Sequence, residues 1–164
     1  MTSYAEDCAQ IRRLLALYCR GIDRLDCTLL TKVYWEDGTD HHGNFMGPAP
    51  DFIDYIIPRL KQRYIRTHHM LGHSLLNVVD GVANCETYFY AQHLLRDPNG
   101  QNHVTVGRYM DRLSKRNGEW RISEREVIMD WYVTHPVGPT VLEWPYFGTA
   151  NKEDPSYRML GSLG

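Results

Sequence analysis

The chain has 164 residues, a formal net charge of −2 at pH 7 and 43% hydrophobic residues. This length is expected to give one domain with a sizeable core, and the lack of a basic excess or polybasic block argues against nucleic acid and membrane surfaces as partners. No apolar run approaches the roughly 20 residues that a membrane-spanning helix needs.

The beginning of the chain and the cysteines bear on its location. The first residues, MTSYAEDCAQIRR, are polar and acidic, whereas a secretory signal begins basic and continues apolar. Cys8, Cys19, Cys27 and Cys85 have no CxxC spacing and lie in apolar-periodic segments, so we expect buried thiols in a reducing compartment. A cytoplasmic protein is therefore expected.

The first segment of the chain is predicted to be a helix. Ser3 and Glu6 have the spacing of a capping box, in which the two side chains satisfy backbone donors at a helix start. Gly21 and Asp23 lie where this helix is expected to end. Apolar residues recur between these points at helical spacing, namely Ile11, Leu14, Leu15, Tyr18 and Ile22.

Three further elements are expected before residue 66. Asp26 can cap a short second helix through CTLLTKVYW, and the segment EDGTDHHGNFMGP has the composition of a short hairpin. The segment APDFIDYIIPRLKQRY is expected to form a third helix that is interrupted or restarted at Pro58, because proline lacks the backbone donor.

The second half of the chain changes to the alternating pattern of strands. Turn signals at Asp80-Gly81, at 97–100 and at Asn117-Gly118 divide it into four antiparallel strands, roughly 72–79, 82–96, 101–115 and 119–133. Helices followed by a sheet, without strand–helix alternation, predict an α+β domain over residues 1–135. Residues 136–164 are rich in proline, glycine and aromatics, and we expect an irregular but ordered tail over a surface, a pocket mouth or a neighbouring subunit.

Turn chemistry predicts which side chains share a face of the sheet. Residues 115–119 fit a three-residue loop in which Lys115 faces Glu119, and this register puts Tyr109 opposite Arg125. A lone arginine on a mostly apolar face is costly unless it is paired or faces a wet cavity. The predicted face carries Thr87, Phe89, Ala91, His93, Thr105, Gly107, Tyr109, Arg125, Val127 and Met129.

Histidines gather in the segment RTHHMLGHS, residues 66–74, which allows a metal site, a structural cluster or a catalytic base. His69 and His73 have the spacing of metal ligands on a helix, but Gly72 and the following strand pattern argue against a helix here. His41 and His42 are adjacent, so on a strand they point to opposite faces. We therefore expect no metal site. A catalytic histidine needs a carboxylate that orients its ring, and the candidates are Asp23, Asp26, Asp37 and Asp40.

Three segments together resemble one family. They are ALYCRGIDRLDCTLLTKVYWEDG, THHMLGHSLLNVVDGVANCETYF and GRYMDRLSKRNGEWRISEREV. In order and spacing they resemble the SnoaL-like branch of the superfamily named after nuclear transport factor 2, over about residues 5–135. The superfamily includes dehydratases, a hexachlorocyclohexane dehydrochlorinase, polyketide cyclases and non-catalytic dioxygenase subunits. The resemblance implies a cone-shaped α+β fold, with a curved sheet wrapped over the N-terminal helices and a deep apolar pocket.

The resemblance also implies roles for individual residues. Asp23 corresponds to the aspartate after the first helix in the eliminating enzymes, His69 to their histidine, and Arg125 to the arginine after the tryptophan of the last long strand. Tyr18 stands where the dehydrochlorinase has a lysine, and His73 departs from the usual polar residue four positions after the histidine. Candidate substrate-binding residues are Tyr18, Asp40, His42, His73, Phe89, Tyr109 and Met129.

These positions predict a lyase that needs no cofactor and acts on a hydrophobic ring compound such as a steroid, a polyketide or a lignin-derived aromatic. His69 would remove a proton while Asp23 stabilises the imidazolium, and Arg125, with Tyr18 or Tyr109, would bind an oxyanion or assist a leaving group. An isomerase or aldol cyclase could use the same dyad, and a binding or assembly protein could use the same scaffold. In the structural alternative, Arg125 forms an ion pair with Asp23 or Asp40, and the tyrosines are core residues.

The opposite face of the predicted sheet is expected to support self-association. Tyr88, Tyr90 and Met110 fall on this outer face and would expose a sizeable aromatic patch in a monomer. A homodimer or homotrimer is therefore expected. His68 points the other way from His69 on a strand and is expected at the surface.

Overall fold

The computed structural model describes residues 3–97, 100–137, 147–161 and 163. Helices come first in the chain, long strands follow, and a short helix lies in the C-terminal segment. The elements are α1 (Tyr4–Asp23), α2 (Cys27–Val33), β1 (Tyr34–His42), β2 (Phe45–Pro48), α3 (Ala49–Arg63), β3 (Tyr64–Val79), β4 (Val82–Leu95), β5 (Gln101–Arg116), β6 (Glu119–Pro136) and α4 (Pro155–Leu160).

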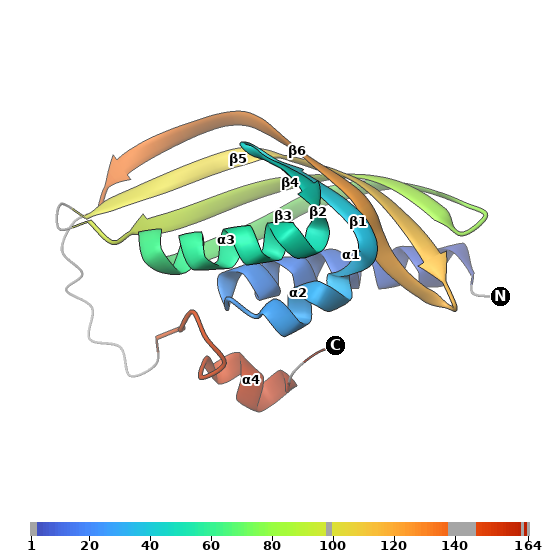
Figure 1. Ribbon diagram of the computed structural model, residues 1–164, viewed down its shortest axis with the longest axis horizontal. Helices are drawn as coiled ribbons and strands as arrows, with labels where there is room; N and C mark the ends of the chain where they lie inside the picture. Colours follow the sequence, from blue (N-terminus) through green and yellow to red (C-terminus); the bar gives the residue numbers. More distant parts are fainter. Residues whose placement is uncertain (1–2, 98–99, 138–146, 162, 164) are drawn as a thin grey trace.

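A single curved sheet covers the helices (Figure 1). Its strand order is β2-β1-β6-β5-β4-β3, and only β1 and β6 pair in parallel among these neighbours. The helices α1, α2 and α3 lie on the concave side of the sheet, where the core is formed. The predicted α+β cone, with helices under a bent and mostly antiparallel sheet, is confirmed.

The first helix begins and packs as its sequence predicts. The Ser3 hydroxyl accepts a hydrogen bond from the Glu6 amide at 3.3 Å, and the Ser3 amide donates to the Glu6 carboxylate at 2.6 Å. The apolar stripe of α1 is buried in the core, where each large aliphatic side chain contributes about 1.5–3 kcal/mol to stability. Asp23, the last residue of α1, is therefore held at a defined place under the sheet.

The third strand and the third helix differ from the predicted ones. The third strand begins at Tyr64 rather than at residue 72, so the whole histidine segment is strand. The third helix continues through Pro58. Pro58 and Asp54 are both exposed, so the Asp54 carbonyl that loses its partner can be hydrated, while core residues on either side keep the two halves of the helix in place.

The β5–β6 hairpin differs from the predicted register. Arg116 pairs with Glu119, and the two-residue turn places Asn117 and Gly118 at φ values of 52° and 88°. Ser123 is then an extra residue in β6, because the register shifts between the pairs Leu113–Ile122 and Arg112–Glu124. The shorter turn and the extra residue together move the cross-strand pairing by two positions. Because side chains alternate along a strand, Arg125 still faces the interior as predicted. Its cross-strand partner is Asp111, and the predicted pairing with Tyr109 is wrong.

The cysteines and helices bear on two further expectations. Cys8, Cys19 and Cys85 are buried free thiols as predicted, whereas Cys27, the first residue of α2, is an exposed free thiol and was predicted wrongly. Within the described parts of the chain, no helix has the length and apolar character needed to cross a membrane.

Candidate functional site

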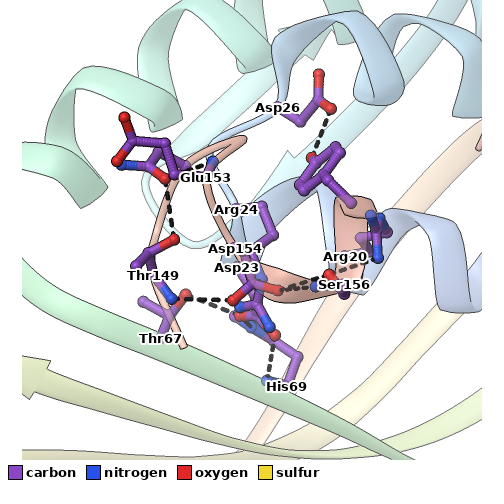
Figure 2. Close-up of polar contacts among 12 residues, drawn as sticks. Arg20, Asp23, Arg24, Asp26, Thr67, His69, Thr149, Glu153, Asp154 and Ser156 are labelled. Carbon is purple, nitrogen blue, oxygen red and sulfur yellow. Dashed lines mark hydrogen bonds and ion pairs between the residues drawn. The ribbon is translucent and has the colours of Figure 1, made fainter. Parts of the chain in front are cut away.

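Asp23 and His69 meet between the end of α1 and the middle of β3 (Figure 2). The His69 Nδ1 atom lies 2.7 Å from Asp23 Oδ1, and the His69 backbone N–H donates to Asp23 Oδ2 at 3.0 Å. The Thr67 hydroxyl donates to Asp23 Oδ1 at 2.8 Å. Thr67 and His69 are alternate residues of one strand, so both side chains reach the same carboxylate from the same face of the sheet.

The surroundings keep this carboxylate ionised. Burial raises the pKa of Asp23, but the hydrogen bonds and charge of His69 and the Thr67 hydroxyl outweigh it, so that the pKa lies below its usual value. The side chains of His69 and Asp23 are only 9% and 10% exposed. An ionised aspartate at Nδ1 holds the proton of a neutral imidazole on that nitrogen, which leaves Nε2 as the basic atom. The pair can therefore act as an oriented base.

His93 lies beside the dyad and was not among the predicted site residues. Its ring centroid is 5.3 Å from that of His69 in an edge-on arrangement and 5.0 Å from that of Tyr64. Burial, followed by the charge of His69, lowers the pKa of His93 to about 3, so its ring is neutral at physiological pH. The predicted inner face did include His93, but the sequence could not show that β3 sets His69 next to it.

Arg125 and Asp111 form a second, fully buried centre. Arg125 donates from Nε and Nη2 to the two carboxylate oxygens of Asp111 at 2.6 and 2.8 Å, and both side chains are 0% exposed. The expected ion-pair partners, Asp23 and Asp40, are therefore wrong. Burial lowers the pKa of Arg125, but the charge of Asp111 outweighs it and keeps the guanidinium protonated. Nη1 of Arg125 has no hydrogen-bond partner within the described residues.

Tyrosines enclose this arginine. The guanidinium carbon lies 4.0 Å from the Tyr18 ring centroid and 4.2 Å from that of Tyr109, with Tyr34 at 6.0 Å. Burial raises the pKa of all three phenols far above their usual value, so they stay neutral. Phe89 stacks on Tyr109 at 4.4 Å between centroids. The cage thus joins three predicted substrate-binding residues, Tyr18, Phe89 and Tyr109, to Arg125.

The remaining predicted binding residues fall in three places. Asp40 is buried and accepts a hydrogen bond from the Tyr34 hydroxyl at 2.5 Å, while His42 stacks on Phe52 with its Nδ1 3.5 Å from Asp40. His73, a predicted substrate-binding residue, does not lie beside the dyad, because the register of β3 shifts between Leu71 and Ser74. The shift turns His73 outward, exposed against the Tyr88 ring.

Met129 and His68 complete the predicted set. Met129 is 56% exposed and lies where the β5–β6 register shifts again, so it is not part of the buried group around Arg125. His68 is exposed, as predicted from its neighbour on the strand. In the part of the chain that the structure describes, no three histidine, cysteine, aspartate or glutamate side chains are grouped to hold a metal ion.

Comparison with known proteins places this arrangement in a family. The sequence profile of the SnoaL-like domain matches residues 3–126. The chain belongs to the SnoaL-like family. This confirms the resemblance found in the sequence, including its place in the nuclear transport factor 2-like superfamily. No curated protein gives a sequence match.

Solved structures share the fold of this SnoaL-like domain. A type 2 hexachlorocyclohexane dehydrochlorinase is 19% identical, with a TM-score of 0.73 over 86% of this chain and 95% of that one. A putative scytalone dehydratase from Novosphingobium aromaticivorans is also 19% identical, with a TM-score of 0.73 over 85% and 97%. A variant of Rv3472, a protein of unknown function from Mycobacterium tuberculosis, is 25% identical, with a TM-score of 0.66 over 76% and 72%.

Proposed function

We propose that this SnoaL-like domain is a lyase that removes a leaving group, most simply water, from a hydrophobic ring compound without a cofactor. The observation that carries the proposal is the buried pair of His69 and Asp23, in which Nδ1 is bound at 2.7 Å and Nε2 is left as the base. Structural relatives named as a dehydrochlorinase and a putative dehydratase support an elimination.

In the proposed reaction the base acts first. Nε2 of His69 takes a proton from a carbon next to a carbonyl, and the ionised Asp23 stabilises the imidazolium that forms. The electrons of the broken C–H bond form the new C=C bond as the C–O bond to the leaving hydroxyl breaks. The imidazolium returns its proton to that hydroxyl, so water leaves and the dyad is restored. General-base catalysis of this kind contributes about 10²–10⁴ in rate.

In this proposal Arg125 binds the substrate through one hydrogen-bond donor. Its Nε and Nη2 atoms are occupied by Asp111, whereas Nη1 has no partner among the described residues. A substrate oxygen that accepts from Nη1 would satisfy this buried donor. The charge of Arg125 is already balanced, so it would bind a carbonyl oxygen more readily than a full oxyanion.

Isomerisation and aldol cyclisation begin with the same proton transfer. They differ in the fate of the carbanion, which returns a proton to another carbon or attacks a carbonyl instead of expelling water. The three outcomes give different products, and the identity of the product therefore distinguishes them. The binding or assembly alternative predicts that ring compounds bind without any chemical change.

The test uses a panel of cyclic β-hydroxy ketones on steroid and tetralone frameworks, followed by the ultraviolet absorbance of the product, an enone or a naphthol respectively. His69→Gln is expected to lower turnover by about 10²–10⁴ while the melting temperature stays within a few degrees of the wild type. His68→Gln is the matched control, because His68 is the adjacent and exposed histidine. Equal turnover by His69→Gln and wild type would refute the base assignment.

A further inference from the structure

A cavity of about 540 Å³ opens beside the dyad on the side of the C-terminal segment. Asp23 and Thr67 line it, so it reaches the carboxylate that orients His69. Its other walls are the end of α3, the start of β3 and residues 149–152, and Figure 2 draws Thr67 and Thr149 of this lining close to Asp23. Its cationic lining is Arg24, Lys61, Arg66, Arg96 and Lys152, and we call it the basic cavity.

Charges in the basic cavity are unbalanced. Asp23 is the single carboxylate in its lining among the described residues, and His69 already occupies it. Arg24 is paired with Asp154 at 3.2 Å, and Lys152 lies 3.5 Å from Asp26.

That leaves three lysine and arginine residues in the lining. Lys61, Arg66 and Arg96 have no carboxylate within ion-pair distance in the described parts of the chain. The chain as a whole carries a net charge of −2, so this excess of positive charge is a local feature.

We infer that the basic cavity binds an anionic group, a carboxylate or a phosphate ester, that the substrate carries at a distance from its reacting carbon. The inference rests on the proposed function, because it takes the ring of the same molecule to lie at His69. Guanidinium and ammonium groups make short, charge-assisted hydrogen bonds to both kinds of anion. Apolar side chains of Ile57, Leu60 and Tyr64 line the same cavity and suit the carbon linker between ring and anion.

Arg66 has the central place in this arrangement. It lines the basic cavity and also a neighbouring cavity of about 210 Å³, which shares Asp23, Arg24 and Thr67 with the first. Arg66 lies on strand β3, one residue before Thr67 and three before His69, so the sheet holds its backbone close to the dyad. Binding energy gained at such a remote group can be used to hold the reacting carbon at the base.

The experiment measures binding rather than turnover. Isothermal titration at 50 mM salt would compare 2-naphthyl phosphate, 2-naphthylacetate and neutral 2-naphthol on the wild type, on a double variant with Lys61→Gln and Arg66→Gln, and on Arg13→Gln. The Arg13→Gln variant is the matched control, because it removes an exposed cation of α1 outside the basic cavity.

At least one of the two anions is expected to bind the wild type tenfold or more tightly than naphthol, and the tighter one identifies the group. The double variant should lose most of that preference while its affinity for naphthol is unchanged, and raising the salt to 500 mM should weaken only the anion. Equal affinities for anions and naphthol, or a double variant that binds anions like Arg13→Gln, would overturn the inference. His69→Gln should bind the anion normally, so a failed base assignment and a failed anion site give different results.

Discussion

Replacing Arg125 by methionine should destabilise the fold strongly, because it leaves the carboxylate of Asp111 buried without a partner. Both side chains are 0% exposed and are joined by two hydrogen bonds. Breaking such a pair costs about 3–5 kcal/mol, and some of the packing of the guanidinium on Tyr18 and Tyr109 is lost as well. For a chain of this size each kcal/mol lowers the melting temperature by about 2–4 °C, so a decrease of roughly 6–20 °C is expected.

The decisive comparison is with the double variant, Arg125→Met with Asp111→Leu. Apolar residues of similar volume can replace a buried ion pair at little cost, so the double variant should be far more stable than Arg125→Met alone. Urea unfolding followed by circular dichroism would give the free energy of unfolding of the wild type, the two single variants and the double variant. These four values give the coupling energy between Arg125 and Asp111. A loss below about 1 kcal/mol for Arg125→Met, or additive effects of the two changes, would refute the reasoning.

Three further predictions follow from the dyad, its neighbour and the outer face. The lowered pKa of Asp23 contributes stability that is present above the unfolded carboxyl pKa and lost as the pH falls through the folded value, so Asp23→Asn should lose less stability than wild type in urea melts below about pH 4. The pKa of His93 is about 3, so on acidification the unfolded chain binds this proton first and stability is lost as the pH falls from 6.5 toward 3. His93→Gln should reduce this loss in the free energy of unfolding by several kcal/mol. Parallel curves of unfolding free energy against pH for the variant and the wild type would count against it. Tyr88 and Met110 are 38% and 39% exposed on the outer face, so changing both to lysine should shift the expected dimer or trimer to monomer in sedimentation velocity, whereas a wild-type monomer at micromolar concentration would contradict self-association there.

The parts of the fold that depend on local signals could be predicted from the sequence. The capping box, the apolar stripe of α1 and the turn signals at residues 80–81 and 117–118 all lie where the structure has a helix start, a buried face and hairpin turns. Local patterns suffice here because caps and tight turns are decided by neighbouring residues. The inward orientation of Arg125 was also predicted from turn geometry. This prediction is correct only because the two register shifts add up to two positions, which leaves the face of the strand unchanged.

What could not be predicted depends on contacts between distant residues. A register shift in β3 turns His73 outward. In RTHHMLGHS only Gly72 indicates where this irregularity lies. Asp111 was missed as the partner of Arg125 because the two-residue turn and the extra residue in β6 together decide which β5 side chain stands opposite. The pairing of Asp23 with His69 came from the family resemblance, since spacing alone could not rank the four candidate aspartates.

The C-terminal segment has a consequence for the motions of the dyad. Asp154 pairs with Arg24, the Ser156 hydroxyl accepts a hydrogen bond from Arg20 at 2.9 Å, and the Tyr157 hydroxyl donates to Asp26, 131 residues away in sequence, at 2.7 Å. Contacts on both sides of the dyad's aspartate therefore link the two ends of the chain. Local opening of the segment would release the last turn of α1, so amide hydrogen exchange over residues 20–26 should report how often the base loses its orientation.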